Sequence, residues 1–478
     1  MKKVLPILII ALVGFLAYSN SLSNGFVWDD SALIHSAASV NSLSGIANAF
    51  ERCILGVSGK SNGYYRPLQL ISYAADRLVW GYKPLGYHLT SVITQILNSI
   101  LLFYFLIFIS GNRRVSLGVA CIFCVHPAFI PNAGYISGRA DLLGFFFTVS
   151  SVFLMIRYIV SGKGTGILAA SCACYIMALL SREYCVIAPL FVLLYMVSFK
   201  DKIRTRLGAF IGLIALASIA FMYVALRCTI LNFHQDTGII GKLPVWIRIL
   251  LSPYLFTGYL RVLAVPVDLG FDKKLIASSL ADPRFVASWI TVFVIAAIFY
   301  YLYKKGRREK LFYLSWFVIG IIPVLHVFVP LVAIANDHWT YIPSLGYFAF
   351  FLSISDDWLR KILPDKRASH AFALICAILT IFYATVTHTQ NRYWKDDESL
   401  FTRMYAVNKY TGRTQFNLAR VYEQKGQYGK AMEFYDMAIK SSEGRFAYMY
   451  NARGMLRIKT GDMAGAKKDF EAAAEIRR

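Results

Sequence analysis

The chain has 478 residues, of which 57% are apolar, and its mean hydropathy is positive. This composition excludes an ordinary soluble domain, because several uncharged stretches of roughly 15–24 residues are long enough to cross a bilayer as helices. The formal charge of +23 does not indicate nucleic-acid binding, because most Lys and Arg residues lie in short clusters between apolar runs, where they hold loops on the cytoplasmic face.

The apolar runs and the basic clusters between them predict how the chain crosses the lipid bilayer. The first run, near residues 4–20, is expected to be an uncleaved helix, because no convincing small-x-small cleavage site of a secretory signal follows it. Further runs lie near 87–110, 115–131, 140–160, 166–181, 185–198, 207–226, 247–265, 286–303, 311–334, 341–354 and 369–388. Basic clusters occur at Lys2–Lys3, Arg113–Arg114, Arg157 with Lys163, Lys200–Arg206, Lys304–Lys310 and Arg360–Arg367. If all of these clusters are cytoplasmic, residues 21–86 form a first outer loop.

The run near 247–265 does not fit a regular alternation of crossings. Three apolar runs lie between the clusters at 200–206 and 304–310, whereas two cytoplasmic clusters require an even number of crossings. This run contains two arginines, Pro253 and Gly258, and it is therefore interpreted as re-entrant or as lying along the interface. The expected fold class is all-α, a polytopic membrane protein with about 11 transmembrane helices and its C-terminus outside.

The residues from Trp394 onward are polar and helix-forming, and they contain an internal repeat. Ala419, Gly426, Ala431, Tyr435 and Ala438 recur, each 35 positions later, as Gly454, Gly461, Ala466, Phe470 and Ala473. Small residues that let helices approach, with an aromatic between them, are typical of tetratricopeptide repeats, whose period is ~34 residues. The segment 399–410 resembles the second helix of a degenerate earlier repeat. Residues 391–478 are expected to form an extracytoplasmic repeat domain after a membrane domain at 1–390, with an unrelated helical hairpin as the alternative.

Two adjacent acids, Asp29 and Asp30, follow the first apolar run at the outer membrane interface. One interpretation is that they are solvated loop acids or cap a helix that starts at Ser31. The other depends on the polar residues expected on the same side, since charged groups that converge near membrane depth tend to mark functional sites. These residues are Arg66, His88, His126, Arg139, Asp141, Arg182, Glu183, Asp337 and His338.

Arginines on one face, together with one or two carboxylates, suit a phosphate leaving group beside a hydroxyl that loses its proton. Arginine binds phosphate oxygens in a bidentate manner, and a carboxylate near the reacting hydroxyl acts as a general base. Each single arginine is as readily explained as an interfacial anchor. The cluster as a whole favours the functional interpretation.

The order and spacing of these stretches resemble a known family along nearly the full chain. The matching stretches are FVWDD, YYRPL, GYHLTSVITQILN, HP followed by ISGRADLL, SREY and NDHWTYIPSLGY, and then the repeats. With them the chain resembles a bacterial relative of the transmembrane and tetratricopeptide repeat-containing O-mannosyltransferases. More broadly, it is similar to the membrane glycosyltransferases of the C-type fold.

The resemblance implies an inverting glycosyltransferase that takes mannose or a similar sugar from a polyprenyl- or dolichyl-phosphate donor. It implies that Asp29 or Asp30 deprotonates an acceptor hydroxyl, which attacks the anomeric carbon as the lipid phosphate leaves. The candidates for stabilising that phosphate are Arg66, Arg139 and Arg182. The supporting residues are His88, His126, Asp141, Glu183, Asp337 and His338.

Two positions depart from the family pattern. Relatives commonly have Glu four residues after the Pro of HP, where this chain has Pro131, and they usually read Asp-Arg-Tyr where it has Asp337-His338-Trp339. The lost acid and the weakened cation put the sugar, the metal requirement or the activity itself in question. Some C-type enzymes use a divalent cation held by acids. No strong ligand set is found here, so no obligatory metal or cofactor is expected, and a divalent cation is kept as the alternative.

The leading functional hypothesis is transfer to an acceptor on the extracytoplasmic face, a Ser or Thr of a protein or peptide recruited by the concave surface of the repeats. One alternative is an inactive membrane-anchored scaffold that assembles envelope proteins, which position 131 favours. Another alternative keeps the chemistry with a glycolipid or polysaccharide acceptor. The short inner loops suggest a bacterial inner membrane with the repeats in the periplasm or outside, whereas a eukaryotic relative would place the same face in the endoplasmic reticulum lumen.

Overall fold

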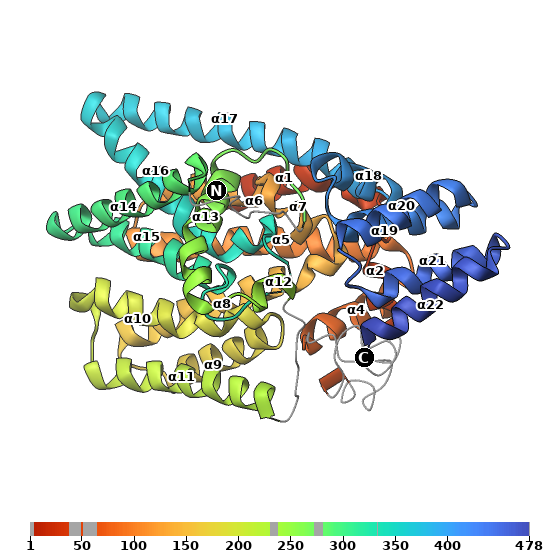
Figure 1. The fold of residues 1–478 in the computed structure, drawn as a ribbon. Coiled ribbons are helices and arrows are strands. Elements are labelled where there is room, and N and C mark those ends of the chain that lie inside the picture. The colour runs from red at the N-terminus through yellow and green to blue at the C-terminus, as the bar shows by residue number, and fades with distance from the viewer. Residues whose placement is uncertain are drawn as a thin grey trace.

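The computed structural model describes residues 4–37, 49–50, 65–229, 238–271, 281–331 and 333–477 (Figure 1). In these ranges the chain is helical and contains no β-strand, which confirms the all-α fold class. Long helices lie side by side in a bundle, and the helices that end the chain, in blue in Figure 1, gather at one end of it.

The centre of the bundle is built around α6 (Arg113–Val125). Almost every residue of this helix from Val115 onward is buried. Its neighbours are α1 (Leu5–Tyr18), α5 (Pro84–Ser110), α16 (Tyr341–Ile362) and α17 (Asp365–Asn391), and α8 (Arg139–Ser161) packs on α5. A helix that is apolar on all sides belongs in an interior, so the sequence of α6 explains its position.

A second set of helices packs on the outside of this centre. It comprises α9 (Thr165–Leu179), α10 (Ala188–Ser198), α11 (Arg206–Thr229), α13 (Val245–Ala264), α14 (Pro283–Lys304) and α15 (Arg308–Ile321). α9 and α11 contact α8, α10 contacts α15, and α14 contacts α13 and α15. Large apolar side chains such as Phe221 on α11 and Phe293 on α14 are exposed. A surface this apolar suits contact with lipid chains.

Seven helices are long and apolar enough to cross a membrane, or up to eight if one bent pair counts as a single span. They support an integral membrane protein. The sequence predicts about 11 crossings. Other apolar helices of the same bundle are shorter or less hydropathic than those seven. They are Thr165–Leu179, Glu183–Ser198, α15 and α16.

The break in the helical bundle falls at a different place from the one expected. The run near 247–265 forms one continuous helix, α13, with Pro253 inside it, so a re-entrant loop there is contradicted; its alternative location along the interface stays a prediction. Instead, the axes of α6 and the segment Pro127–Ala133 differ by 51°. The cause is local, since a residue that precedes proline avoids the helical region, and His126 has an extended backbone with ψ 129°.

Short helices connect the long ones at the end of the bundle nearest the repeats. They are η1 (Ser19–Ser23), α2 (Asp30–Ala37), α4 (Pro67–Trp80), η3 (Pro127–Phe129), α7 (Ile130–Ala133), η4 (Ile136–Gly138), η5 (Glu183–Ile187), α12 (Gly238–Gly241), η8 (Asp337–Thr340) and η9 (Arg392–Trp394). Elsewhere in the chain lie η6 (Lys200–Lys202) and η7 (Ile322–Val324). The residues singled out in the sequence lie mainly in or beside the first group.

The C-terminal residues form the paired helices that the repeat pattern predicts. α19 (Gly412–Gln424) pairs with α20 (Tyr428–Ser441), and α21 (Ala447–Lys459) pairs with α22 (Met463–Arg477). Ala419, Ala431 and Tyr435 are buried in one hydrophobic cluster. In the next pair a Cβ on Gly454 would lie 3.0 Å from the ring of Phe470. The small residues and the aromatic therefore have the packing roles expected of them.

The helix that precedes the repeats, α18 (Asp397–Val407), joins them to the bundle. Leu400 and Phe401 of α18 and Leu418 of α19 belong to the same hydrophobic cluster as the helices of the bundle. The backbone N–H of Gly25 donates to the carbonyl of Lys395 at 2.9 Å. The first repeat is therefore packed against the loop that follows α1.

The close approach of α15 and α16 gives a test of this packing. A Cβ at Gly346 would press on the backbone oxygen of Tyr313 and the backbone nitrogen of Phe317, neither of which can move aside cheaply. We expect Gly346→Ala to lower the free energy of unfolding by about 1–3 kcal/mol, measured by thermal unfolding in detergent. Gly429→Ala is the matched control, because a Cβ there meets open space. Equal melting temperatures for the two variants would contradict the packing.

Candidate functional site

The two adjacent acids lie in a strained turn after α1. Trp28 has a φ of 52°, in the left-handed region that bulky residues rarely adopt. Its backbone N–H donates to Asp397 Oδ1 of α18 at 2.7 Å, and the N–H of Asp30 donates to the carbonyl of Val27 at 3.0 Å. The turn directs the carboxylates of Asp29 and Asp30 to different partners.

Asp30 is fully buried and binds the segment between α7 and α8. Its Oδ1 accepts from the backbone N–H and the hydroxyl of Ser137 at 2.8 and 2.5 Å, and its Oδ2 accepts from the N–H of Val27 at 3.1 Å. Burial raises the pKa of Asp30 to about 7, although these hydrogen bonds act in the opposite direction. These contacts suit a structural carboxyl that fixes the start of α2.

Asp29 is partly exposed and has different neighbours. Its backbone N–H donates to the hydroxyl of Tyr135 at 3.3 Å. Burial raises the pKa of Asp29; the charge of Arg413 and a side-chain hydrogen bond with Tyr135 lower it, and the charge of Asp397 raises it. Of the two acids, Asp29 is the one that a ligand can reach.

A cluster of three arginines and two carboxylates lies at the ends of α8, α9 and α11. Arg66 donates to Glu183 from Nε and Nη2 at 3.1 and 3.0 Å, and Arg182 Nε lies 2.7 Å from Asp141 Oδ1. The third member is Arg227, whose Nη1 lies 3.7 Å from Glu183 Oε1. Among the residues that the structure describes, the cluster holds three cations and two anions. This is the balance that attracts a phosphate.

Arg227 is the residue that the sequence analysis missed. It lies near the C-terminal end of α11, and its Nη1 donates to Tyr223 at 3.2 Å. The apolar run 207–226 starts after a basic cluster assigned to the cytoplasm, so its far end is expected outside. A basic residue at an outer end, where the positive-inside rule does not require one, was the signal that could have found it.

His338 and Phe271 lie between the acid turn and the arginine cluster. His338 Nε2 is 3.9 Å from Asp141 Oδ2, and the rings of His338 and Phe271 have centroids 5.2 Å apart. Phe271 in turn lies 5.3 Å from Trp28. Burial lowers the pKa of His338 to about 4, so its ring is neutral at pH 7 and adds no charge to the cluster.

Asp337 holds the segment that carries Phe271. Its Oδ2 accepts from the backbone N–H of Gly270 at 2.9 Å, and Thr340 Oγ1 donates to its carbonyl at 2.7 Å. Asp337 is buried, and by holding Gly270 it supports the ring contact between Phe271 and His338. Its role in the described part of the chain is to position a neighbour.

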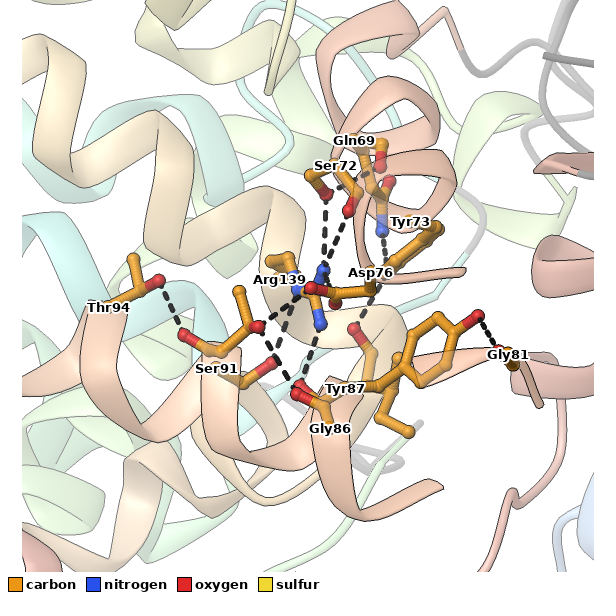
Figure 2. A network of polar contacts seen from close by, with 12 residues as sticks. Gln69, Ser72, Tyr73, Asp76, Gly81, Gly86, Tyr87, Ser91, Thr94 and Arg139 are labelled. Atoms are coloured by element: carbon orange, nitrogen blue, oxygen red, sulfur yellow. Dashed lines mark hydrogen bonds and ion pairs between the residues drawn. The ribbon is translucent and has the colours of Figure 1, made fainter. Parts of the chain in front are cut away.

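Arg139 lies in a separate network between α4 and α5 (Figure 2). The side chain is fully buried, and its Nη1 is 2.5 Å from Asp76 Oδ2. It also donates to the carbonyl of Tyr87 at 2.7 Å and covers the ring of Tyr73 at 4.7 Å. Its charge is paired and enclosed, so Arg139 belongs to the packing of the helices and is separate from the cluster that contains Arg66 and Arg182.

The two remaining histidines support the backbone. His88 Nε2 lies 3.4 Å from the carbonyl of Gly25, which places it under the acid turn. His126 Nδ1 accepts from the N–H of Ala128 at 3.3 Å, and its Nε2 lies 3.2 Å from the carbonyl of Leu263. His126 therefore forms hydrogen bonds with backbone groups at the break after α6 and has no contact with Asp29 or Asp30 among those described.

The position of the lost family acid is enclosed. Pro131 is buried in α7, and the next residue, Asn132, is fully buried with neither side-chain polar atom hydrogen-bonded to any described residue. Among the described residues no group of three or more His, Cys, Asp or Glu side chains could hold a metal ion.

Burial of the Arg139 charge leads to a stability prediction. Arg139→Met leaves Asp76 unpaired inside the protein, and we expect it to lower the free energy of unfolding by about 3–5 kcal/mol, measured by thermal unfolding in detergent. Adding Asp76→Asn to this variant should recover part of the loss. Arg308→Met is the control, because the ion pair of Arg308 with Asp201 is exposed and contributes about 0–1 kcal/mol. A wild-type melting temperature for Arg139→Met would contradict the pairing.

The raised pKa of Asp30 predicts how stability depends on pH. The folded state holds the proton of Asp30 up to about pH 7, whereas the unfolded state releases it near 3.8, so the contribution of Asp30 to stability falls as the pH rises through this window. The melting temperature of Asp30→Asn minus that of the wild type should therefore rise between about pH 4 and pH 7 and level off above. A difference that stays flat or falls would contradict the assignment.

A model of the tetratricopeptide repeat family matches residues 412–444 and 447–478, which are the helix pairs α19–α20 and α21–α22. The repeat prediction is thereby confirmed.

Similarity to curated proteins extends over most of the chain. The chain is 23% identical over 463 residues to the protein O-mannosyl-transferase TMTC3 of Mus musculus, covering 87% of this chain and 49% of that protein. It is 30% identical over 172 residues to the protein O-mannosyl-transferase Tmtc1 of Drosophila melanogaster, covering 35% and 17%. The chain thus spans about half the length of the first of these curated relatives. The expected similarity to the transmembrane and tetratricopeptide repeat-containing O-mannosyltransferases is confirmed.

Among solved structures, the fold is similar to that of the oligosaccharyltransferase of Archaeoglobus fulgidus in its apo form. The TM-score is 0.50 with 14% sequence identity, over 86% of this chain and 59% of that one. At this identity the similarity concerns the fold alone. It agrees with the expected membrane glycosyltransferase fold.

Proposed function

We propose that the chain is a membrane glycosyltransferase that moves mannose or a similar sugar from a polyprenyl-phosphate donor to an acceptor hydroxyl. The observation that carries the proposal is a continuous series of contacts from the acid turn through Trp28, Phe271 and His338 to Asp141, the partner of Arg182. An acid that can take a proton and cations that can receive a leaving phosphate lie at the two ends of this series. The similarity to O-mannosyl-transferases supports the same reaction class.

In this proposal Asp29 is the general base. Its carboxylate takes the proton of the acceptor hydroxyl, whose oxygen then bonds to the anomeric carbon from the face opposite the phosphate. The bond between that carbon and the phosphate oxygen breaks, and the electron pair leaves with the lipid phosphate. This sequence inverts the anomeric centre. The more enclosed carboxyl of Asp30 holds the turn in place.

The arginine cluster stabilises the charge that grows on the leaving phosphate. Each guanidinium carries a permanent positive charge and five N–H donors, and Arg66 and Arg182 are paired with Glu183 and Asp141. The ion pairs also orient Arg66 and Arg182 before the donor arrives, which reduces the reorganisation needed in the transition state. No obligatory metal is proposed, and a divalent cation that binds with the donor is the alternative.

In this proposal the repeats bind the acceptor. Residues 1–390 form the membrane domain and residues 391–478 the repeat domain on the extracytoplasmic side, in a bacterial inner membrane with the repeats in the periplasm or outside. Tetratricopeptide repeats offer a concave surface to extended segments. A Ser or Thr of a protein or peptide is therefore the proposed acceptor, with a glycolipid or polysaccharide as the alternative.

A second candidate function is an inactive membrane-anchored scaffold for envelope proteins. The observations that favour it are Pro131, which stands where relatives commonly have an acid, and the neutral ring of His338, which stands where they usually have an arginine. Under this function the repeats capture partners and the acid turn has no chemical role. Deletion of residues 399–478 should then abolish partner capture, while changes at Asp29 leave it intact.

The role of Asp29 as general base leads to a direct test. We expect Asp29→Asn to lower the rate of sugar transfer by about 10²–10⁴-fold, since a positioned general base contributes that much. The measurement is transfer from polyprenyl-phosphate mannose by the purified protein, together with glycan analysis of envelope proteins in cells. Asp201→Asn is the control, because Asp201 is an exposed acid in the basic cluster assigned to the cytoplasm. An Asp29→Asn variant that transfers sugar at the wild-type rate would remove Asp29 as the base, whereas absence of transfer by the wild-type protein would leave the scaffold as the better explanation.

The arginine cluster leads to a separate test. We expect Arg182→Met and Arg227→Met each to lower the transfer rate by about 10²–10³-fold, because each removes a cation that acts on the leaving phosphate. Arg284→Met is the matched control, since that arginine pairs with Asp282 and its side chain is 72% exposed. The result that would remove Arg227 from the site is a normal rate in a variant that accumulates at the wild-type level.

A further inference from the structure

The strained turn that carries Asp29 is held by the helix that leads into the repeats. A bulky residue in the left-handed region costs about 1–3 kcal/mol and persists only where its surroundings fix it. The surroundings of Trp28 come largely from α18: Asp397 Oδ1 accepts its N–H at 2.7 Å, and the ring of Phe401 lies 5.9 Å from its indole. Tyr135 and Phe271 pack on the other sides of the indole.

A second set of contacts joins the same two regions. The N–H of Gly25 donates to the carbonyl of Lys395 at 2.9 Å, and the ring of Tyr135 lies 5.1 Å from that of Trp394. Residues 394–401 therefore contact Gly25 and Trp28 of the acid turn, and they also contact Tyr135, which packs on the turn. The turn is thus held in part by α18 and by the residues that directly precede it.

The charges around Asp29 belong to the same helices. Asp397 on α18 raises its pKa, and Arg413 on α19 lowers it. The other groups that face Asp29 are Tyr135, whose hydroxyl bonds with it, and Asp30, which is adjacent in the turn. Two residues outside the membrane bundle thus act in opposite directions on the acid that the proposed reaction uses.

We propose that Asp397 is a positioning residue of the acceptor site, so that Asp29 is aimed at the acceptor hydroxyl only when α18, the helix that leads into the repeats, is docked on the acid turn. Asp397 acts through Trp28, whose backbone it holds. The charge of Arg413, which lowers the pKa of Asp29, serves as a probe of opposite sign. The repeats then do more than recruit the acceptor, because they complete the site that deprotonates it. This inference rests on the proposed function, in which Asp29 is the general base.

Three variants separate the hydrogen bond from the charges. Asp397→Asn keeps an oxygen that can accept from Trp28 N–H but removes the charge, so its kcat should fall less than that of Asp397→Ala. Asp397→Ala also removes the hydrogen bond, and its kcat should fall by about 10²-fold because the base is misplaced. Arg413→Gln removes the cation that faces Asp29. Arg420→Gln, on the exposed side of the same helix, is the control and should leave the pH profile unchanged.

The deciding measurement is the pH dependence of kcat/KM. Loss of the Asp397 charge should move its acidic limb to lower pH, and loss of the Arg413 charge should move it to higher pH, because the two charges act on Asp29 with opposite signs. A merely structural role for either residue would change the rate and leave the limb where it is. Limbs that do not move, or that move in the same direction, overturn the inference.

A readout without turnover distinguishes this inference from the proposed function. A carbodiimide modifies protonated carboxyls, so labelling of Asp29 against pH, read by mass spectrometry in the full-length protein, follows its ionisation. The labelling midpoint should rise in Arg413→Gln and fall in Asp397→Asn. Unshifted midpoints with an inactive Asp29→Asn overturn the positioning inference and keep the function. Shifted midpoints with an active Asp29→Asn support the geometry and overturn Asp29 as the base.

Discussion

Pairing of charge at the edge of the bundle decides which residues can act on a ligand. An unpaired charge is expensive where lipid and protein replace water, and each arginine of the candidate site accordingly has a carboxylate within reach. Arg139 and Asp76 complete their pair inside the protein, so this pair fixes α8 against α4. The pairs of Arg66 with Glu183 and of Arg182 with Asp141 lie in the cluster that the proposed function assigns to the phosphate. The same requirement for charge pairing therefore gives a structural ion pair at Arg139 and a candidate binding site at Arg66 and Arg182.

The repeats and the membrane bundle form one structure at the acid turn. Leu400 and Leu418 share a hydrophobic cluster with the bundle, and Asp397 fixes the backbone of Trp28. Short repeat arrays are unstable alone, since each unit needs a neighbour to cover its apolar face. Here the first unit gains that cover from the loop after α1. Stability of the repeats and geometry of the acid turn thus depend on the same contacts.

The features that could be predicted from the sequence are those encoded locally. Helical spans follow from apolar runs, and the repeats follow from small and aromatic residues at a fixed offset. The difference between Asp29 and Asp30 could not be predicted, because it depends on the turn at Trp28, whose N–H donates to Asp397, 369 positions further along the chain. The run at 247–265 was expected to be re-entrant or to lie along the interface, and the re-entrant form is contradicted: Pro253 is accommodated within α13, whereas Pro127 forces the residue before it out of the helix at the end of α6. Arg227 was missed because its carboxylate partner lies in another loop.

Four consecutive residues at the start of α8, residues 138–141, have three different structural roles. Gly138 allows the backbone of α7 to lie directly against it, Arg139 points to α4, and Asp141 points to Arg182. Successive side chains on a helix are separated by roughly 100°, so neighbouring positions serve different directions. Inserting one residue here would rotate every later side chain out of line with its partner at once. Evolution of this segment is therefore confined to substitution in place, and length changes among related chains should fall in the loops around it.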